Sequence, residues 1–217
     1  LKLDQIHVYD TSVPLVEDVH WHVGYNNSVE KILDSLQPLG ADYMEILRKG
    51  LLEDRWADRY ESKGKRSGAY SSGCYDSNPF ILMNYREDNI NSMYTLAHEA
   101  GHSMHSFFSR KTQPYLYADY TIFVAEVAST FNEVLLTKYL LSLDIDKSME
   151  IYLVCREIDN LRGTLYRQTM FAEFEYLIYS TAESKKPMAV DVFREIYINL
   201  LKKYFGEETI LDDCLSL

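Results

Sequence analysis

The second half of the chain, from Asp88 nearly to its end, repeats apolar residues at helical spacing with few interruptions. Breaks are expected only at Pro114, over 143–146 and at Pro187, the two prolines because proline ends a helix. Because this pattern covers more than half of the chain, too few residues remain to form a large sheet, and a mainly helical fold is favoured. It predicts helices over 89–110, 119–142, 147–181 and 189–204.

The first half of the chain is more mixed. Residues 1–24 follow no regular pattern and are expected to form an extended segment. A helix is predicted to start at Ser28 as its N-cap and to end before Pro38, and a second helix is predicted over about 42–51. Short aromatic and branched runs predict two strands, over 67–75 and 79–84, joined by a turn. The expected fold class is mainly α with one small β-hairpin or sheet.

Composition excludes several classes of protein. The 217 residues carry 22 Lys and Arg against 33 Asp and Glu, a net charge of −11, which argues against binding to nucleic acid or to a membrane surface. No apolar run approaches the roughly 20 residues that cross a bilayer. Cys74, Cys155 and Cys214 are widely spaced and are expected to be free thiols in a reducing, cytoplasmic compartment.

One short segment concentrates residues that bind metals. Three of the six histidines fall between His98 and His105, and the first five residues of this segment spell HExxH. His98 and His102 lie one helical turn apart on the same face, so each can direct a ring nitrogen at one ion. Glu99 projects beside the pair, where it can reach a metal-bound water. Gly101 costs about 1 kcal/mol relative to alanine in a helix, which predicts close packing against the backbone there.

A catalytic zinc site takes three protein ligands, so the sequence must supply one more. Glu126 is the first candidate, because its apolar neighbours predict a buried carboxylate that needs a cation. Glu133 lies seven residues later on the same face and is a second candidate, or a partner that accepts a ligand histidine's N–H. His105 is two turns beyond His98 and too far to share one ion.

Four blocks of this sequence resemble the oligoendopeptidase F branch of the thimet-oligopeptidase family of zinc peptidases. In chain order they are KGKRSGAYSSGCYDSNPFILMNY, HEAGHSMHSFFS, YTIFVAEVASTFNE and RQTMFAEFE. The resemblance implies His98, His102 and Glu126 as ligands of one Zn²⁺, and Glu99 as the catalytic carboxylate. It also implies a helical zinc-peptidase catalytic core and short peptides, rather than folded proteins, as substrates.

The expected reaction is hydrolysis of a peptide bond by a metal-activated water, with Glu99 as general base. The predicted first strand would bind the substrate through Gly68, Ala69 and Tyr70, its free edge pairing with an extended peptide. The small residues of this strand would allow close approach, although the glycines could equally serve only to shape the hairpin.

The resemblance also implies a loop bearing tyrosine and histidine that stabilises the reaction intermediate, and no counterpart of it is found. Tyr176 and Tyr179 could substitute for it, but the apolar period around them predicts core packing. The chain, which begins with Leu1, is therefore expected to be a single central catalytic segment, 1–217, of a larger peptidase. That segment would lack the N-terminal portion and the C-terminal active-site loop, would be weakly active alone, and would have the remainder of the parent polypeptide as a partner.

Two other interpretations stay open. A different family of helical metallopeptidases would be favoured if Glu133 or His105 were the third ligand. Alternatively, the chain is a non-catalytic helical metal-binding or docking module whose metal site is structural or lost. Manganese or cobalt could also occupy a site with two histidines and one glutamate.

Overall fold

The structure is a computed structural model that describes residues 4–16, 19 and 21–212. The chain divides into two compact units, which are described separately: one unites 1–18 with 147–217, and the other comprises 19–146. The predicted fold class is confirmed, since helices dominate both units and the sheets are small. Among the described residues, no helix has both the length and the apolar character needed to cross a bilayer.

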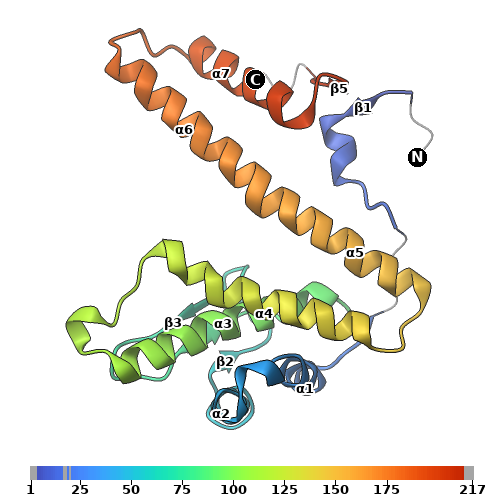
Figure 1. The fold of residues 1–217 in the computed structure, drawn as a ribbon, viewed down its shortest axis with the longest axis vertical. Coiled ribbons are helices and arrows are strands. Elements are labelled where there is room, and N and C mark those ends of the chain that lie inside the picture. Colours follow the sequence, from blue (N-terminus) through green and yellow to red (C-terminus); the bar gives the residue numbers. More distant parts are fainter. Residues whose placement is uncertain (1–3, 17–18, 20, 213–217) are drawn as a thin grey trace. The chain divides into compact units, whose positions relative to one another are not determined.

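The unit of residues 19–146 combines four helices with a small sheet (Figure 1). The helices are α1 (Tyr25–Ser35), α2 (Ala41–Leu52), α3 (Ile90–Thr112) and α4 (Ile122–Ser142), and the strands are β2 (Ala57–Asp58), β3 (Tyr70–Ser72) and β4 (Phe80–Leu82).

The start of α1 differs from the prediction. Gly24, not Ser28, is the N-cap, so Ser28 lies inside the first turns of the helix. Ser28 is fully buried there and its hydroxyl hydrogen-bonds the hydroxyl of Tyr85, which also donates to the Val23 carbonyl at 2.8 Å. The serine therefore joins α1 to the segment before α3 instead of capping the helix.

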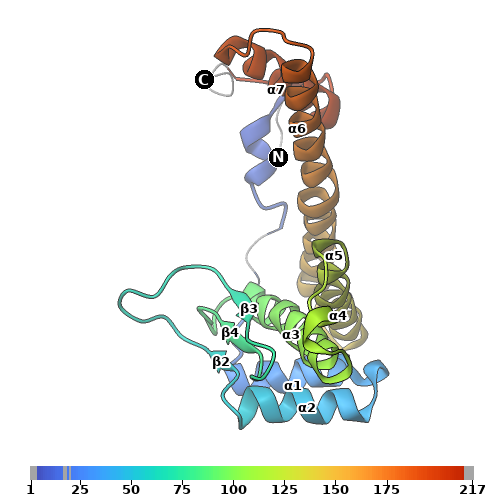
Figure 2. The same ribbon diagram turned by 90° about the vertical axis from the view of Figure 1, so that its left-hand side faces the viewer.

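The sheet has the order β2-β4-β3, with β2 parallel and β3 antiparallel to β4. The predicted hairpin is confirmed as β3 and β4, although both strands are much shorter than expected. Strand β2 was not predicted, because two residues carry no recognisable alternation. Gly68 and Ala69 precede β3 and end the loop from β2, which projects away from the sheet (Figure 2).

Helices α3 and α4 pack side by side (Figures 1 and 2). A Cβ atom on Gly101 would lie 2.7 Å from the Ala128 carbonyl oxygen and 2.7 Å from the Ser129 Cα atom. The predicted close packing at Gly101 is thus confirmed, and α4 provides the contact. This approach brings the HExxH turn of α3 against the first half of α4.

The other unit joins the beginning of the chain to its last helices. In the segment expected to be extended, Ile6–His7 form the strand β1, whereas Val8–Ser12 differ from the expectation and form a 3-10 helix. Strand β1 pairs in parallel with β5 (Thr209–Ile210), and His7 Nδ1 lies 3.0 Å from an Asp212 carboxylate oxygen. The predicted helix over 147–181 is divided into α5 (Lys147–Leu161) and α6 (Arg167–Glu183) by a π-helical turn (Arg162–Tyr166).

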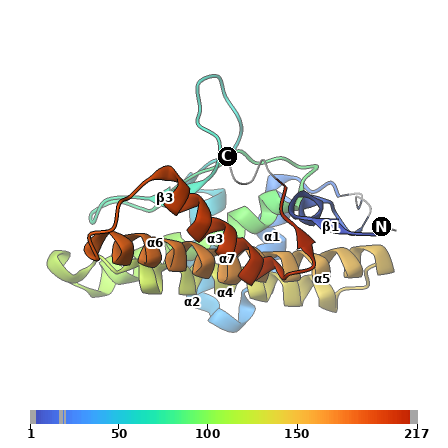
Figure 3. The same ribbon diagram turned by 90° about the horizontal axis from the view of Figure 1, so that it is seen from above.

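Helix α7 (Val190–Phe205) packs against α6 (Figure 3). Their shared core contains Met170, Leu200 and Leu201. Tyr176 and Tyr179 do not join this core, since they are 69% and 62% exposed. The prediction of core packing for both tyrosines is therefore wrong, because the buried side of α6 faces α7 through other positions of the helix.

Candidate metal centre

Three ligand atoms form a compact triangle between α3 and α4. His98 Nε2 and His102 Nε2 lie 3.2 Å apart, and the Glu126 Oε2 atom is 3.4 Å from each of them. Ligands about 2.0–2.1 Å from a tetrahedral zinc ion are separated by about 3.3–3.4 Å. Two imidazoles and one carboxylate are also a donor set that zinc accepts. Of the described residues, these three form the group that could hold a metal ion.

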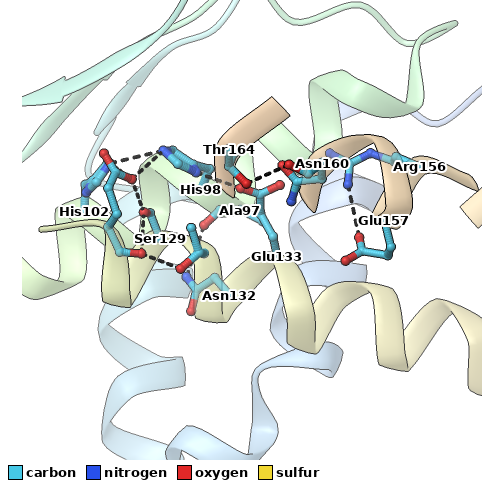
Figure 4. A network of polar contacts seen from close by, with 12 residues as sticks. Ala97, His98, His102, Ser129, Asn132, Glu133, Arg156, Glu157, Asn160 and Thr164 are labelled. Carbon is cyan, nitrogen blue, oxygen red and sulfur yellow. Dashed lines mark hydrogen bonds and ion pairs between the residues drawn. The ribbon is translucent and has the colours of Figure 1, made fainter. Parts of the chain in front are cut away.

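The surroundings of His98 select one tautomer of its ring. His98 Nδ1 lies 2.8 Å from Glu133 Oε1 (Figure 4). Because a carboxylate accepts, the N–H is on Nδ1, and Nε2 of the neutral ring is left with a free lone pair towards His102. Burial lowers the pKa of His98, but the hydrogen bond and charge of Glu133 outweigh burial, so the pKa is raised overall. Glu133 thus lies behind the ring, where it orients His98.

Glu126 reaches the histidine pair, meaning His98 and His102, from the first half of α4. Ser129, one turn later and fully buried, donates its hydroxyl to Glu126 Oε2 at 2.7 Å. The expected burial of Glu126 is wrong, since its side chain is 51% exposed and its neighbour Phe123 is 87% exposed. The apolar residues around Glu126 in sequence do not surround its carboxylate in space, because the contact with α3 and not sequence neighbours sets its environment.

Glu99 is buried beside the histidine pair, with 7% of its surface exposed. Burial raises the pKa of its carboxyl above the ordinary value, and two effects offset this only in part: the charge of His98 and a hydrogen bond from the backbone amide of Ser71. A carboxyl group with a raised pKa is a stronger base when ionised, which suits a group that accepts a proton from water.

His102 and the nearby His105 differ in their surroundings. Burial and then the charge of His98 lower the pKa of His102, which favours the neutral form that binds metals. His105 does not face the pair: its ring stacks on Tyr120, with centroids 3.8 Å apart and planes 12° from parallel.

The candidate substrate residues lie at and before β3. Tyr70 is in the strand and half-exposed, whereas Gly68 and Ala69 are in the preceding loop, where Gly68 has a φ of 88°. The sheet face that carries Tyr70 and Phe80 is hollowed by a cavity of about 350 Å³.

Sequence reasoning missed three residues that support the site. Ser129 holds Glu126, and the backbone of Ser71 lowers the pKa of Glu99, against the larger effect of burial. Asn132 is buried and donates to the Ala97 carbonyl at 3.1 Å, which ties α4 to α3 next to His98 (Figure 4). Only the spacing of Ser129 from Glu126, one helical turn, could have indicated its role from sequence.

Comparison with known proteins places the chain in a peptidase family. Residues 9–216 match peptidase family M3, and the chain therefore belongs to that family.

Two relatives match along the whole chain. Oligopeptidase PepF of Bacillus subtilis is 49% identical over 217 residues, which are 100% of this chain and 32% of that protein. An oligoendopeptidase F homologue of Borreliella burgdorferi is 46% identical over 100% of this chain and 37% of its own length. The chain thus spans about a third of the curated relatives it matches.

Solved structures agree with the fold. A crystal structure from Chlamydophila abortus is 41% identical and superposes with a TM-score of 0.84, covering 99% of this chain and 36% of that one. Oligoendopeptidase-F from Enterococcus faecium is 27% identical, with a TM-score of 0.63, over 99% of this chain and 30% of its own.

Proposed function

We propose that this chain is the central catalytic segment of a larger zinc endopeptidase that hydrolyses short peptides. The observation that carries the proposal is the triangle of His98, His102 and Glu126, whose edges of 3.2, 3.4 and 3.4 Å suit a tetrahedral zinc ion. Family membership and the similarity to oligoendopeptidases support peptides as the substrate class. Glu133 behind the His98 ring supports Glu126, rather than Glu133, as the third ligand.

Each residue has a distinct task in this proposal. His98, His102 and Glu126 would hold the zinc ion, with Glu133 and Ser129 orienting His98 and Glu126. A bound zinc ion supplies Lewis acidity, which polarises a carbonyl and makes water more acidic. Glu99 would accept the proton of the attacking water and deliver it to the leaving amine. Strand β3, with the preceding Gly68 and Ala69, would hold the peptide in an extended form.

The chain is proposed to be weakly active by itself. It spans about a third of its relatives' length, and the residues that would stabilise the tetrahedral intermediate are proposed to belong to the rest of the parent polypeptide. A cytoplasmic location also belongs to the proposal and rests on the sparse, widely spaced cysteines.

Metal analysis of the purified chain tests the site directly. We expect one zinc ion per chain, lost in His98→Ala and kept in His105→Ala, a matched control because His105 stacks on Tyr120 away from the pair. In the same preparations, Glu99→Gln should keep its zinc and abolish cleavage of a quenched fluorescent peptide. A folded wild-type chain that binds no metal would refute the proposal and favour a docking module.

A further inference from the structure

Helices α3 and α4 meet in one antiparallel register, meaning a fixed alignment of their residues. The facing pairs along the contact are Tyr94 with Thr137, His98 with Glu133, and Gly101 with Ser129. As the residue number rises on α3 it falls on α4, and the alignment is the same for all three pairs. This register places Glu133 behind the His98 ring and puts the carboxylate of Glu126, seven residues earlier, 3.4 Å from the Nε2 atom of His98. A shift of α4 along α3 would move both carboxylates.

Asn132 is a buried polar residue within this contact, with 1% of its surface exposed. Its side-chain amide donates to the Ala97 carbonyl of α3 at 3.1 Å (Figure 4) and to the Tyr43 hydroxyl of α2 at 3.3 Å. Burying an amide without hydrogen bonds costs free energy, because the group loses its contacts with water. Asn132 therefore favours an alignment of the helices in which its donors are paired.

Gly101 leaves the Ala97 carbonyl open to this contact. A side chain on a helix covers the turn that precedes it, so the residue four positions later shields a main-chain carbonyl. Gly101 holds that position for Ala97 and is the only glycine of α3. A slip of α4 by one turn, about 5.4 Å, would bring Asn132 to a carbonyl that is flanked by a side chain. The hydrogen bond from Asn132 therefore favours the observed register over its neighbours.

We propose that Asn132 is a positioning residue for the metal centre, which fixes the register of α4 on α3. It thereby keeps Glu126 in front of the histidine pair and Glu133 behind His98. The inference rests on the proposed function, since it concerns how the proposed zinc site is held. The hydrogen bonds of Asn132 reach none of the candidate ligand atoms, so it acts through the helix that carries both glutamates. A buried asparagine selects one helix register in the same way in coiled coils, at a cost in stability.

An apolar replacement of the amide separates register from stability in the 217-residue chain. Asn132→Leu should keep a urea midpoint near that of the wild type, because the Ala97 carbonyl retains its helical partner, and yet bind zinc about tenfold more weakly. Leu140→Ala is the matched control: this buried, apolar residue of α4 should lower the urea midpoint and leave zinc affinity unchanged. Chelator competition measures the affinities. Wild-type affinity in Asn132→Leu, or equal losses of affinity in both variants, would overturn the inference. If the leucine variant does not fold, the smaller Asn132→Ala decides by the same measurement.

Two spectroscopic measurements follow the register itself. In the metal-free chain, a proton NOE between the Hα atoms of Gly101 and Ser129 reports the alignment. It should be present in the wild type and in Leu140→Ala, and lost or moved to neighbouring residues in Asn132→Leu. The visible spectrum of the Co²⁺-loaded chain, which depends on the geometry of the ligands, should change in Asn132→Leu alone. An unaltered NOE and spectrum in Asn132→Leu would overturn the inference. A wild-type chain that shows the NOE and binds no zinc would refute the proposed function, whereas the NOE decides the register by itself.

Discussion

The two ring nitrogens of His98 face different partners, and the proposed metal-ligand role uses both sides of the ring. Its Nε2 faces His102 and Glu126, and its Nδ1 donates to Glu133 at 2.8 Å. A carboxylate behind a ligand histidine fixes the tautomer and raises the basicity of the ligand nitrogen. With the seven-residue spacing of Glu126 and Glu133 on α4, one helix face would provide both the proposed ligand and the carboxylate that orients His98.

Replacing this support should weaken metal binding without removing the site. We expect Glu133→Gln to lower zinc affinity about 10- to 100-fold, because the ring loses its charged acceptor. Competition with a zinc chelator of known affinity measures the change. Glu45→Gln, an exposed carboxylate of α2, is the control and should bind zinc like the wild type. Equal affinity in Glu133→Gln and wild type would mean that Glu133 has no role in orienting His98.

At the scale of elements, the close approach of α3 and α4 brings the site together. The histidine pair and Glu99 come from α3, whereas Glu126, Ser129 and Glu133 come from α4. Gly101 permits this approach, since no side chain separates the two backbones there.

Adding one methyl group at this contact should destabilise the unit. Gly101→Ala improves helix propensity by about 1 kcal/mol, but its Cβ would lie 2.7 Å from the Ala128 carbonyl oxygen. Overpacking of this kind typically costs about 1–3 kcal/mol, so a net loss in the free energy of unfolding is expected, together with weaker zinc binding as Glu126 moves from the histidines. Urea unfolding measures the first effect and chelator competition the second.

Gly163→Ala provides the control for helix propensity. Gly163 is also in a helical segment, and a Cβ there would meet no atom within 4 Å. This variant should be neutral or slightly more stable. If Gly101→Ala behaved like Gly163→Ala, the proposed role of Gly101 in helix packing would be wrong.

At the scale of the whole molecule, stability should depend on the ionisation of a buried tyrosine. Burial raises the pKa of Tyr25 from 10.0 to about 12, although the Arg59 guanidinium, 4.0 Å from the ring centroid, opposes this. The folded state holds the phenol proton more tightly than the unfolded chain does. This contribution to stability is therefore fully present below pH 10 and is lost as the pH rises from about 10 to about 12.

The corresponding test compares wild type with Tyr25→Phe, which cannot ionise. Between about pH 9 and pH 11, the free energy of unfolding of the wild type should fall by about 1 kcal/mol more than that of the variant. Urea unfolding at a series of pH values measures both slopes. Parallel curves would show that the phenol of Tyr25 titrates alike in the folded and unfolded states.

The rate of turnover is a second property that depends on the whole molecule. If the residues that stabilise the intermediate lie in the rest of the parent polypeptide, turnover by this chain should be about 10²–10³-fold below that of a full-length relative, as for the loss of one oxyanion donor. Cleavage of the same fluorescent peptide by both proteins measures the ratio. Comparable turnover that Glu99→Gln abolishes would mean that this segment suffices for catalysis.

The sequence by itself determined the features that depend on near neighbours. The periodicity placed α3, α4 and α7 to within a few residues, and HExxH put His98 and His102 on one face, because both follow from the 3.6-residue helical repeat. The same local reasoning placed the start of α1 too late, at Ser28 instead of Gly24. It also failed for the burial of Glu126, where sequence neighbours were taken for spatial neighbours.

Only the tertiary structure decided which groups meet across long separations. Glu133 reaches His98 over 35 residues and Ser71 reaches Ser103 over 32. The pairing of β2 with β4 likewise joins residues 24 apart, Ala57 and Ile81. The physical reason is that such contacts depend on how whole helices and strands pack against one another. The close approach of Gly101, in α3, to the backbone of α4 is one example. A local pattern along the chain does not predict that packing.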